Sequence, residues 1–353
     1  MSDTPQLDRD DVKQPATPTV RLPFDRAEYD ARIAKTRRAM EKAQIDLLIV
    51  TDPTNMAWLT GYDGWSFYVH QCVLLALDGE PVWYGRGQDA NGALRTVFMK
   101  RDNIIGYPDH YVQSTERHAM DYLAREVIEA RGWQARRIGV EMDNYYFSAA
   151  AYASLQRNLP KATWRDATAL VNWQRAVKSP REIEYMRVAA RIVEKMHAQI
   201  VERIEPGMRK SDLVAQIYSA GITGVDGYGG DYPAIVPLLP TGADAAAPHL
   251  TWDDKPFAAN AGTFFEIAGC FKRDHCPQSA RCISASRRSI SSMRRRRWSK
   301  ASKWVWRRRS RAIPAKTSPM RSLRCCANRA SKRTAVAATR SVRAIRPTGA
   351  SAR

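Results

Sequence analysis

The 353-residue chain has no apolar run near the roughly 18 residues that a membrane-spanning helix needs. Its first residues lack the apolar stretch of a secretory signal, so we expect a disordered tail over 1–20. Six cysteines and no N-x-[Ser/Thr] site give no disulfide framework, which favours a cytoplasmic protein. An apolar share of 44% excludes wholesale disorder, and the length suits two domains.

Acidic residues are missing altogether from the last part of the chain. Residues 280–353 contain 23 Lys or Arg and no Asp or Glu, so 1–279 keep 33 basic residues (56 − 23) and all 36 acidic ones. The net charge of +20 therefore divides into −3 for the body and +23 for the tail. A tail of this kind is typical of nonspecific nucleic-acid binding through phosphate neutralisation.

The basic tail also lacks any helical or strand periodicity, which favours a different explanation. Codons exist that encode 298–306 and, when read from one nucleotide earlier, encode the amphipathic sequence Val-Val-Glu-Gly-Ile-Glu-Met-Gly-Leu. Residues 280–285 and 345–352 also give protein-like sequences under the same shift. We therefore interpret 280–353 as the unstructured product of a frameshift near Ser279, not as an evolved nucleic-acid-binding arm.

Strands and helices alternate through the first half of the body. Apolar periodicity predicts helices over 26–43, 118–131 and 146–158, and strands over 45–50, 72–77, 81–84 and 137–141. Asp78-Gly79 is typical of a hairpin turn between two of these strands. The alternation predicts an α/β domain over 21–175.

The pattern changes near residue 176. Ser179 and Glu182 have the spacing of a capping box, with Pro180 at the first helical position, which predicts a helix to about Ile204. The elements predicted beyond it are a helix over 212–220 capped by Ser211, Gly-rich loops over 221–230 and 237–248, and a strand over 263–268. We expect 176–279 to form the first part of a second, α+β domain.

Several common catalytic motifs are absent. The chain has no P-loop, no dinucleotide fingerprint, no His-Glu-x-x-His and no Gly-x-Ser-x-Gly. Cys270, His275 and Cys276 are three soft metal-ligand types, but their spacing matches no familiar zinc site and no fourth ligand is evident. The pattern favours an interpretation without metal.

Two residues of the second domain are candidates for chemistry. His249 ends a loop of small residues and is a candidate general acid or base, the alternative being a loop histidine bonded to a carbonyl. Glu266 lies inside an apolar strand, where a carboxylate must pair, bind a cation or take a raised pKa. The alternative for Glu266 is a side chain that simple alternation directs into solvent.

Three stretches resemble a known family. Residues 177–183 (VKSPREI), followed by Arg187, resemble the opening of the catalytic domain in creatinase, prolidase and aminopeptidase P. Residues 55–71 (NMAWLTGYDGWSFYVHQ) and 229–242 (GGDYPAIVPLLPTG) resemble a member that opens a cyclic amidine ring. The resemblance covers 21–279 and implies a homodimer of α/β N-terminal domains followed by α+β pita-bread domains, the latter incomplete here.

The resemblance implies roles for individual residues. His249 falls where the family has its catalytic histidine, and Glu266 falls where the metallopeptidase members have their first aspartate ligand. Pro277 falls at the second such ligand and cannot bind metal. The resemblance thus implies a metal-free mechanism like that of creatinase, without any cofactor, in which Glu266 holds a cationic amidine and His249 handles the proton.

The resemblance also implies a substrate-binding role for the aromatic segment. Trp65, Phe67, Tyr68 and His70 are expected to contact the substrate by cation–π or packing interactions, the alternative being that these rings belong to the core. The expected partner is a small molecule, with no membrane partner and with nucleic acid bound only nonspecifically by the tail.

Two other functions remain open from the sequence. One is a metal-dependent Xaa-Pro aminopeptidase or prolidase of the same fold, against which Pro277 argues. The other is a pseudoenzyme or nonspecific nucleic-acid-binding module acting through the basic tail. Because the family's remaining strands, helices and acidic residues are not recognisable beyond Ser279, we expect the polypeptide as written to be inactive.

Overall fold

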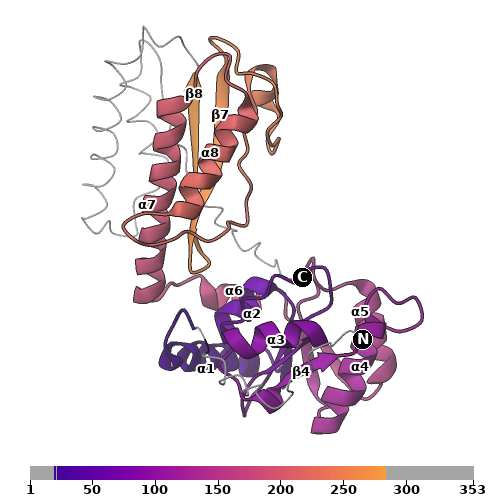
Figure 1. Cartoon of the computed structure of the whole chain (residues 1–353). Coiled ribbons are helices and arrows are strands. Elements are labelled where there is room, and N and C mark those ends of the chain that lie inside the picture. The colour runs from indigo at the N-terminus through magenta and orange to yellow at the C-terminus, as the bar shows by residue number, and fades with distance from the viewer. Residues whose placement is uncertain (1–19, 21, 284–353) are drawn as a thin grey trace, which may run out of the picture. The chain divides into compact units, whose positions relative to one another are not determined.

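The computed structural model describes residue 20 and residues 22–283, and the chain divides into two compact units between Lys178 and Ser179. The first unit is drawn in indigo to magenta and the second in pink to orange (Figure 1). The predicted tails over 1–20 and 280–353 lie outside the described residues, apart from Val20 and residues 280–283. Residues 280–283 continue a strand of the second unit, whereas Val20 belongs to no helix or strand.

A six-stranded sheet forms the centre of the first unit, in the order β4-β3-β2-β1-β5-β6. Strand β2 is antiparallel to both of its neighbours, and every other pair is parallel. Gly79 has φ 71° in the turn between β2 and β3, which confirms the predicted hairpin. The strands are β1 (Leu47–Val50), β2 (Cys72–Ala76), β3 (Val82–Arg86), β4 (Ile104–Tyr107), β5 (Arg137–Val140) and β6 (Thr163–Asp166).

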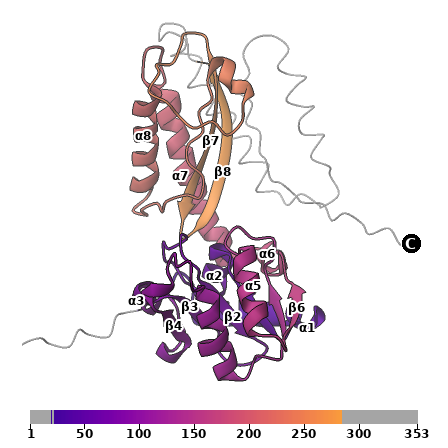
Figure 2. The same ribbon diagram turned by 90° about the vertical axis from the view of Figure 1, so that its right-hand side faces the viewer.

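Helices cover both faces of this sheet, as two apolar clusters show (Figure 2). Leu48 and Val50 pack with α1 (Arg26–Lys42), α2 (Pro53–Thr60), α3 (Gly87–Thr96) and α6 (Leu170–Arg175). Leu47 and Ile49 pack with α4 (Ala119–Tyr122), its π-helical continuation η4 (Leu123–Ile128) and α5 (Ala149–Asn158). Short 3-10 turns are η2 (Arg101–Asn103), η3 (Asp109–Tyr111) and η5 (Glu129–Arg131). The predicted α/β class is confirmed.

The helix predicted over 146–158 begins later than expected, at Ala149. Ser148 is its N-cap, and the Ser148 hydroxyl accepts a hydrogen bond of 3.1 Å from the Ala151 N–H. A serine at this position satisfies one of the free N–H groups of the first turn, so the helix starts directly after it.

The described part of the second unit is a long hairpin with two helices on one face (Figures 1 and 2). Strands β7 (Gly262–Phe271) and β8 (Asp274–Ile283) are antiparallel, and the helices are α7 (Pro180–Arg203) and α8 (Lys210–Thr223). The Ser179–Glu182 capping box is confirmed, because the Ser179 hydroxyl accepts from the Glu182 N–H (3.2 Å) and the Glu182 carboxylate accepts from the Ser179 N–H (2.7 Å).

The predicted start of the second helix is wrong. Helix α8 begins at Lys210, with Arg209 in the N-cap position, and Ser211 lies in its first turn. The Lys210 ammonium is buried and pairs with Asp253 at 2.9 Å, while the Lys210 N–H donates to the carbonyl of Lys255. These tertiary contacts fix Lys210 at the helix start in place of the local serine cap.

Helix α7 crosses β7 at very close range. A Cβ atom at Gly269 would lie 2.2 Å from the carbonyl oxygen of Ala189 and 2.8 Å from the nitrogen of Val193. Only glycine permits this approach, which brings the apolar face of α7 onto Phe265 and Ile267.

No helix among the described residues is long and apolar enough to cross a membrane.

Candidate active site

A short extended segment pairs with β7 on the side opposite to β8. Leu238 and Glu266 exchange two backbone hydrogen bonds, of 3.0 and 3.1 Å. Further along, the Phe264 N–H donates to the carbonyl of Pro240, and the hydroxyls of Thr241 and Thr263 lie 3.1 Å apart. Strand β7 is therefore the middle strand at this point, with Glu266 near its centre.

The side chain of Glu266 lies on the face of β7 away from the helices. Phe265 and Ile267, its neighbours in sequence, belong to the apolar core beneath α7 and α8. Glu266 is half-buried between Leu238 (7% exposed) and Ser279 (8% exposed), its partners on the two flanking strands. Within residues 22–283, no hydrogen bond or ion pair involves its carboxylate. A half-buried carboxylate in this state is suited to a cationic ligand.

His249 is exposed in the loop that follows the 3-10 turn η6 (Gly242–Ala246). Its φ of 68° is left-handed, a conformation that histidine adopts more readily than most residues. The next residue, Leu250, accepts a hydrogen bond from the Leu239 N–H at 3.2 Å. Because Leu239 follows the residue paired with Glu266, the backbone ties the His249 loop to the middle of β7.

The ring of His249 has no hydrogen bond to any described residue, so the alternative of a carbonyl-bonded loop histidine is not observed. The two residues predicted for chemistry therefore belong to one unit and are linked through Leu238 and Leu239. This linkage is through the backbone, and the roles of His249 and Glu266 stay predictions.

The residues of β8 beside Glu266 do not fit a two-metal centre. Pro277 pairs with Ala268, so it lies on the same face as Glu266, diagonally across the two strands. Its side chain has no donor atom. No group of three or more His, Cys, Asp or Glu among the described residues is arranged to hold a metal ion.

Cys270, His275 and Cys276 likewise do not form a metal site. The His275 Nε2 accepts from the Ala234 N–H at 3.0 Å, and its Nδ1 lies 2.8 Å from the carbonyl oxygen of Arg273, so both ring nitrogens are engaged. Burial raises the pKa of the Cys270 thiol to about 12, which disfavours the thiolate that metals bind. Cys276 packs against the apolar core on the opposite face.

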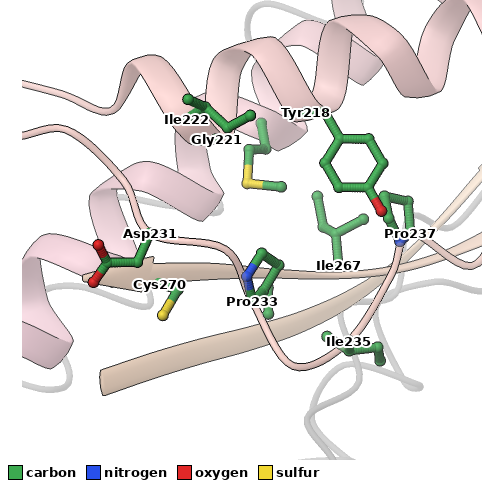
Figure 3. A pocket seen from close by; sticks show the side chains of 11 residues that line it. Tyr218, Gly221, Ile222, Asp231, Pro233, Ile235, Pro237, Ile267 and Cys270 are labelled. Atoms are coloured by element: carbon green, nitrogen blue, oxygen red, sulfur yellow. The ribbon is translucent and has the colours of Figure 1, made fainter. Parts of the chain in front are cut away.

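A small pocket of the second unit lies elsewhere (Figure 3). It lies between α8, β7 and the loop over 231–237, and its walls are mostly apolar. Asp231 is the charged residue of its lining, and the Asp231 carboxylate accepts from the Arg273 N–H at 3.2 Å. Neither His249 nor Glu266 lines this pocket, so it is not the predicted site.

The predicted substrate-binding aromatics lie in the first unit, on the irregular loop over 61–71. Trp65 is 69% exposed and Tyr68 is 59% exposed, so the alternative that these two rings are core is wrong. Phe67 is half-buried, with its ring centroid 5.7 Å from that of Trp65 and 6.2 Å from that of Tyr146. Tyr146 follows β5 and has no sequence signal that would have assigned it to this cluster.

His70, the fourth predicted member, is half-buried, with its ring centroid 4.5 Å from that of His118. Burial, with a smaller contribution from His118, lowers the pKa of His70 to about 4. His118 caps α4, since its Nδ1 accepts from the Met120 N–H at 3.1 Å. His70 is therefore a neutral ring beneath the aromatic loop at neutral pH.

The sequence matches two family models that together cover most of the described chain. Residues 32–177 match the creatinase/prolidase N-terminal domain, and residues 184–302 match metallopeptidase family M24. The chain belongs to this creatinase, prolidase and M24 metallopeptidase family, with an N-terminal creatinase domain and a pita-bread domain.

Individual relatives narrow the comparison. The chain is 63% identical over 265 residues to the ectoine hydrolase of Halomonas elongata, a match that covers 74% of this chain and 66% of that enzyme. It is 26% identical over 213 residues to the creatinase of a Bacillus species, a match that covers 60% of this chain and 49% of that creatinase. A prolidase from Thermococcus sibiricus has the same fold, with a TM-score of 0.62 and 15% identity. The match covers 74% of this chain and 66% of that prolidase.

Proposed function

We propose that the protein is a cytoplasmic ectoine hydrolase that opens the cyclic amidine ring of ectoine to give N-acetyl-diaminobutyrate. The similarity to the Halomonas elongata enzyme supports the substrate. The observation that carries the proposal is that the carboxylate of Glu266 is half-buried on the face of β7 away from the helices and pairs with no described cation. Protonated ectoine presents the delocalised positive charge that such a carboxylate would hold.

In the proposed reaction, the oxygen of a water molecule bonds to the amidine carbon, which lies between the two ring nitrogens. His249 accepts a proton from that water and donates one to the leaving nitrogen as its bond to carbon breaks. One water is consumed, no electrons are transferred, and the product is an amide and an amine in one open chain. Glu266 stabilises the cation before attack and orients the ring.

We propose that this hydrolysis needs no metal. The support lies in the donor set, because Pro277 stands on the face of Glu266 where the metallopeptidase relatives are expected to place their second carboxylate. The described residues therefore lack the pair of adjacent acidic side chains that would bridge two metal ions. Treatment of the enzyme with a chelator should leave ectoine turnover unchanged.

The aromatic loop of the first unit would complete the site in a homodimer. We propose that Trp65, Phe67, Tyr68 and His70 of one subunit cover the reaction site of its partner, as the family resemblance implies. The exposed faces of Trp65 and Tyr68 offer π-electrons to the amidinium, an interaction of about 0.5–2 kcal/mol for each ring.

We propose that the active protein is read in a different frame beyond Ser279. The support is that three segments of the tail become protein-like under one shift of the reading frame. Sequencing the gene across the codons for Gln278 to Ser286 tests this directly. A missing base found there supports the proposal, whereas confirmation of the present base order refutes it and makes the basic tail a real, nucleic-acid-binding candidate.

A substrate panel tests the function itself. The protein encoded by the shifted frame would be incubated with ectoine or an Xaa-Pro dipeptide, each with added Mn²⁺ or with a chelator, and the products followed by NMR. Ring opening of ectoine in the presence of chelator supports the proposal. Cleavage of the dipeptide only with Mn²⁺ would instead identify a metal-dependent aminopeptidase or prolidase.

A further inference from the structure

The loop over 61–71 has no helix or strand, yet it contains both fully buried and exposed residues. Tyr62 and Ser66 are buried, whereas Trp65 and Tyr68 project to the surface. Exposed aromatic side chains bury little apolar surface, so they do not hold the backbone of the loop in place. An irregular loop that presents large rings therefore needs specific attachments to the rest of the unit.

Two of the attachments come from the junction of β3 and α3. Ser66 is a buried residue (2% exposed), and its hydroxyl donates to the Asp89 carboxylate at 2.5 Å. Nη1 of Arg86 donates to the hydroxyl of Tyr68 at 3.2 Å. Arg86 is the last residue of β3 and the N-cap of α3, and Asp89 lies in the first turn of α3, so both contacts start from one rigid corner.

The guanidinium of Arg86 is itself fixed in orientation. Its Nε and Nη2 donate to the two carboxylate oxygens of Asp109, at 2.8 and 3.0 Å. This two-point contact directs Nη1 at Tyr68, because a guanidinium is planar and its N–H groups have a fixed geometry. Asp109 thus orients the group of Arg86 that contacts the loop.

The start of the loop is held by the other end of α3. The Asp63 N–H donates to the Thr96 hydroxyl at 3.3 Å, and a Cβ at Gly61 would lie 2.7 Å from the Thr96 carbonyl oxygen. Gly61 has φ 85°, which glycine adopts without strain. The loop is thus tied to both ends of one short helix.

We propose that Arg86 and Asp89 are positioning residues that hold the 61–71 loop in the one conformation that presents Trp65 and Tyr68 to a cationic cyclic substrate. Neither residue touches the substrate, and each acts through a hydroxyl of the loop. The inference rests on the proposed function for the identity of the substrate, whereas the attachment itself is a property of the chain alone.

The test removes the two hydroxyls and keeps every ring. The double variant Ser66→Ala/Tyr68→Phe loses both attachments but retains Trp65, Phe67 and an aromatic ring at 68. Its matched control is Ser114→Ala/Tyr152→Phe, which also removes one loop serine hydroxyl and one tyrosine hydroxyl from the same unit. Ser114 accepts only the local N–H groups of Glu116 and Arg117, and Tyr152 packs against Phe147 and Trp164.

Two readouts separate attachment from catalysis. Amide hydrogen exchange of the full chain should become about tenfold faster over 62–70 in the double variant and not in the control. In the enzyme of the shifted frame, the KM for ectoine should rise about tenfold while kcat stays within about twofold.

The outcomes distinguish this inference from the proposed function. Unchanged exchange over 62–70 overturns the inference whatever the substrate is. Faster exchange with an unchanged KM in an enzyme that hydrolyses ectoine also overturns it, because the held conformation would then be irrelevant to binding. A wild-type enzyme that leaves ectoine intact refutes the proposed function, and the exchange result alone then decides whether Arg86 and Asp89 hold the loop.

Discussion

Leu238 and Glu266 exchange two backbone hydrogen bonds, of 3.0 and 3.1 Å, across an antiparallel pair that lies outside the β7–β8 hairpin. This pairing fixes the register of the 238–241 segment on β7. A slip by one residue would turn Leu239 out of the core, so the buried side chain of Leu239 specifies the register. The same pairing sets the start of the loop that carries His249.

Replacing Glu266 with Gln should weaken substrate capture. The amide keeps the shape of the side chain but loses the charge that would hold the amidinium, so we expect kcat/KM for ectoine to fall roughly tenfold to hundredfold, mainly through KM. Steady-state kinetics of the shifted-frame enzyme measure this. An unchanged kcat/KM would remove Glu266 from the site. Glu184→Gln, on the exposed side of α7, is the matched control.

Acid should destabilise the second unit through His197. Burial lowers the pKa of His197 to about 4, against a hydrogen bond to the Gln278 backbone that raises it. Between pH 6.5 and 4 the unfolded chain therefore binds a proton that the folded chain does not, and stability is lost as the pH falls. We expect His197 to account for roughly 2–3 kcal/mol of that loss.

Urea unfolding at pH 7 and pH 4.5 measures this effect. The variant His197→Gln should lose less stability between the two pH values than the wild type, and His110→Gln, at an exposed site, should behave like the wild type. An equal pH dependence in His197→Gln and wild type would show that His197 is not the titrating group. His70, whose pKa is also about 4, gives the corresponding test in the first unit.

Gly269→Ala should destabilise the second unit by roughly 1–3 kcal/mol, because the added methyl would overlap the α7 backbone at Ala189 and force the helix off the strand. Gly262→Ala, on the same strand, is the control, since its Cβ would meet nothing within 4 Å. Thermal or urea unfolding compares the two variants. Equal stabilities would contradict the close approach of α7 and β7.

The parts of the fold with strong local signals were predictable from the sequence. Asp78-Gly79 specified a hairpin turn, and Ser179 with Glu182 specified the start of α7. Helix α3 was missed because it is only 10 residues long and contains two glycines, Gly87 and Gly92, which lower helix propensity. Strand β6 was missed because its residues are largely exposed at the edge of the sheet, so burial left no pattern in the sequence.

The candidate site was only partly predictable, for a related reason. The resemblance to a known family gave His249 and Glu266 their expected roles, whereas the pairing of Leu238 with Glu266 joins residues 28 positions apart without any local signal. The contact between Arg86 and Tyr68 is also invisible in the sequence, since it depends on how α3 and the loop pack. Tertiary contacts of this kind are set by the folded core and not by neighbouring residues.

Ectoine hydrolysis by the shifted-frame enzyme and its His249→Ala variant, measured side by side, tests the central claim most directly. We predict formation of N-acetyl-diaminobutyrate by the wild type in the presence of chelator. We also predict a loss of roughly 10²–10⁴-fold in kcat for His249→Ala, with an unchanged circular dichroism spectrum, because the general acid and base would be gone. Turnover by His249→Ala at the wild-type rate, or none by a correctly folded wild type, would contradict the account.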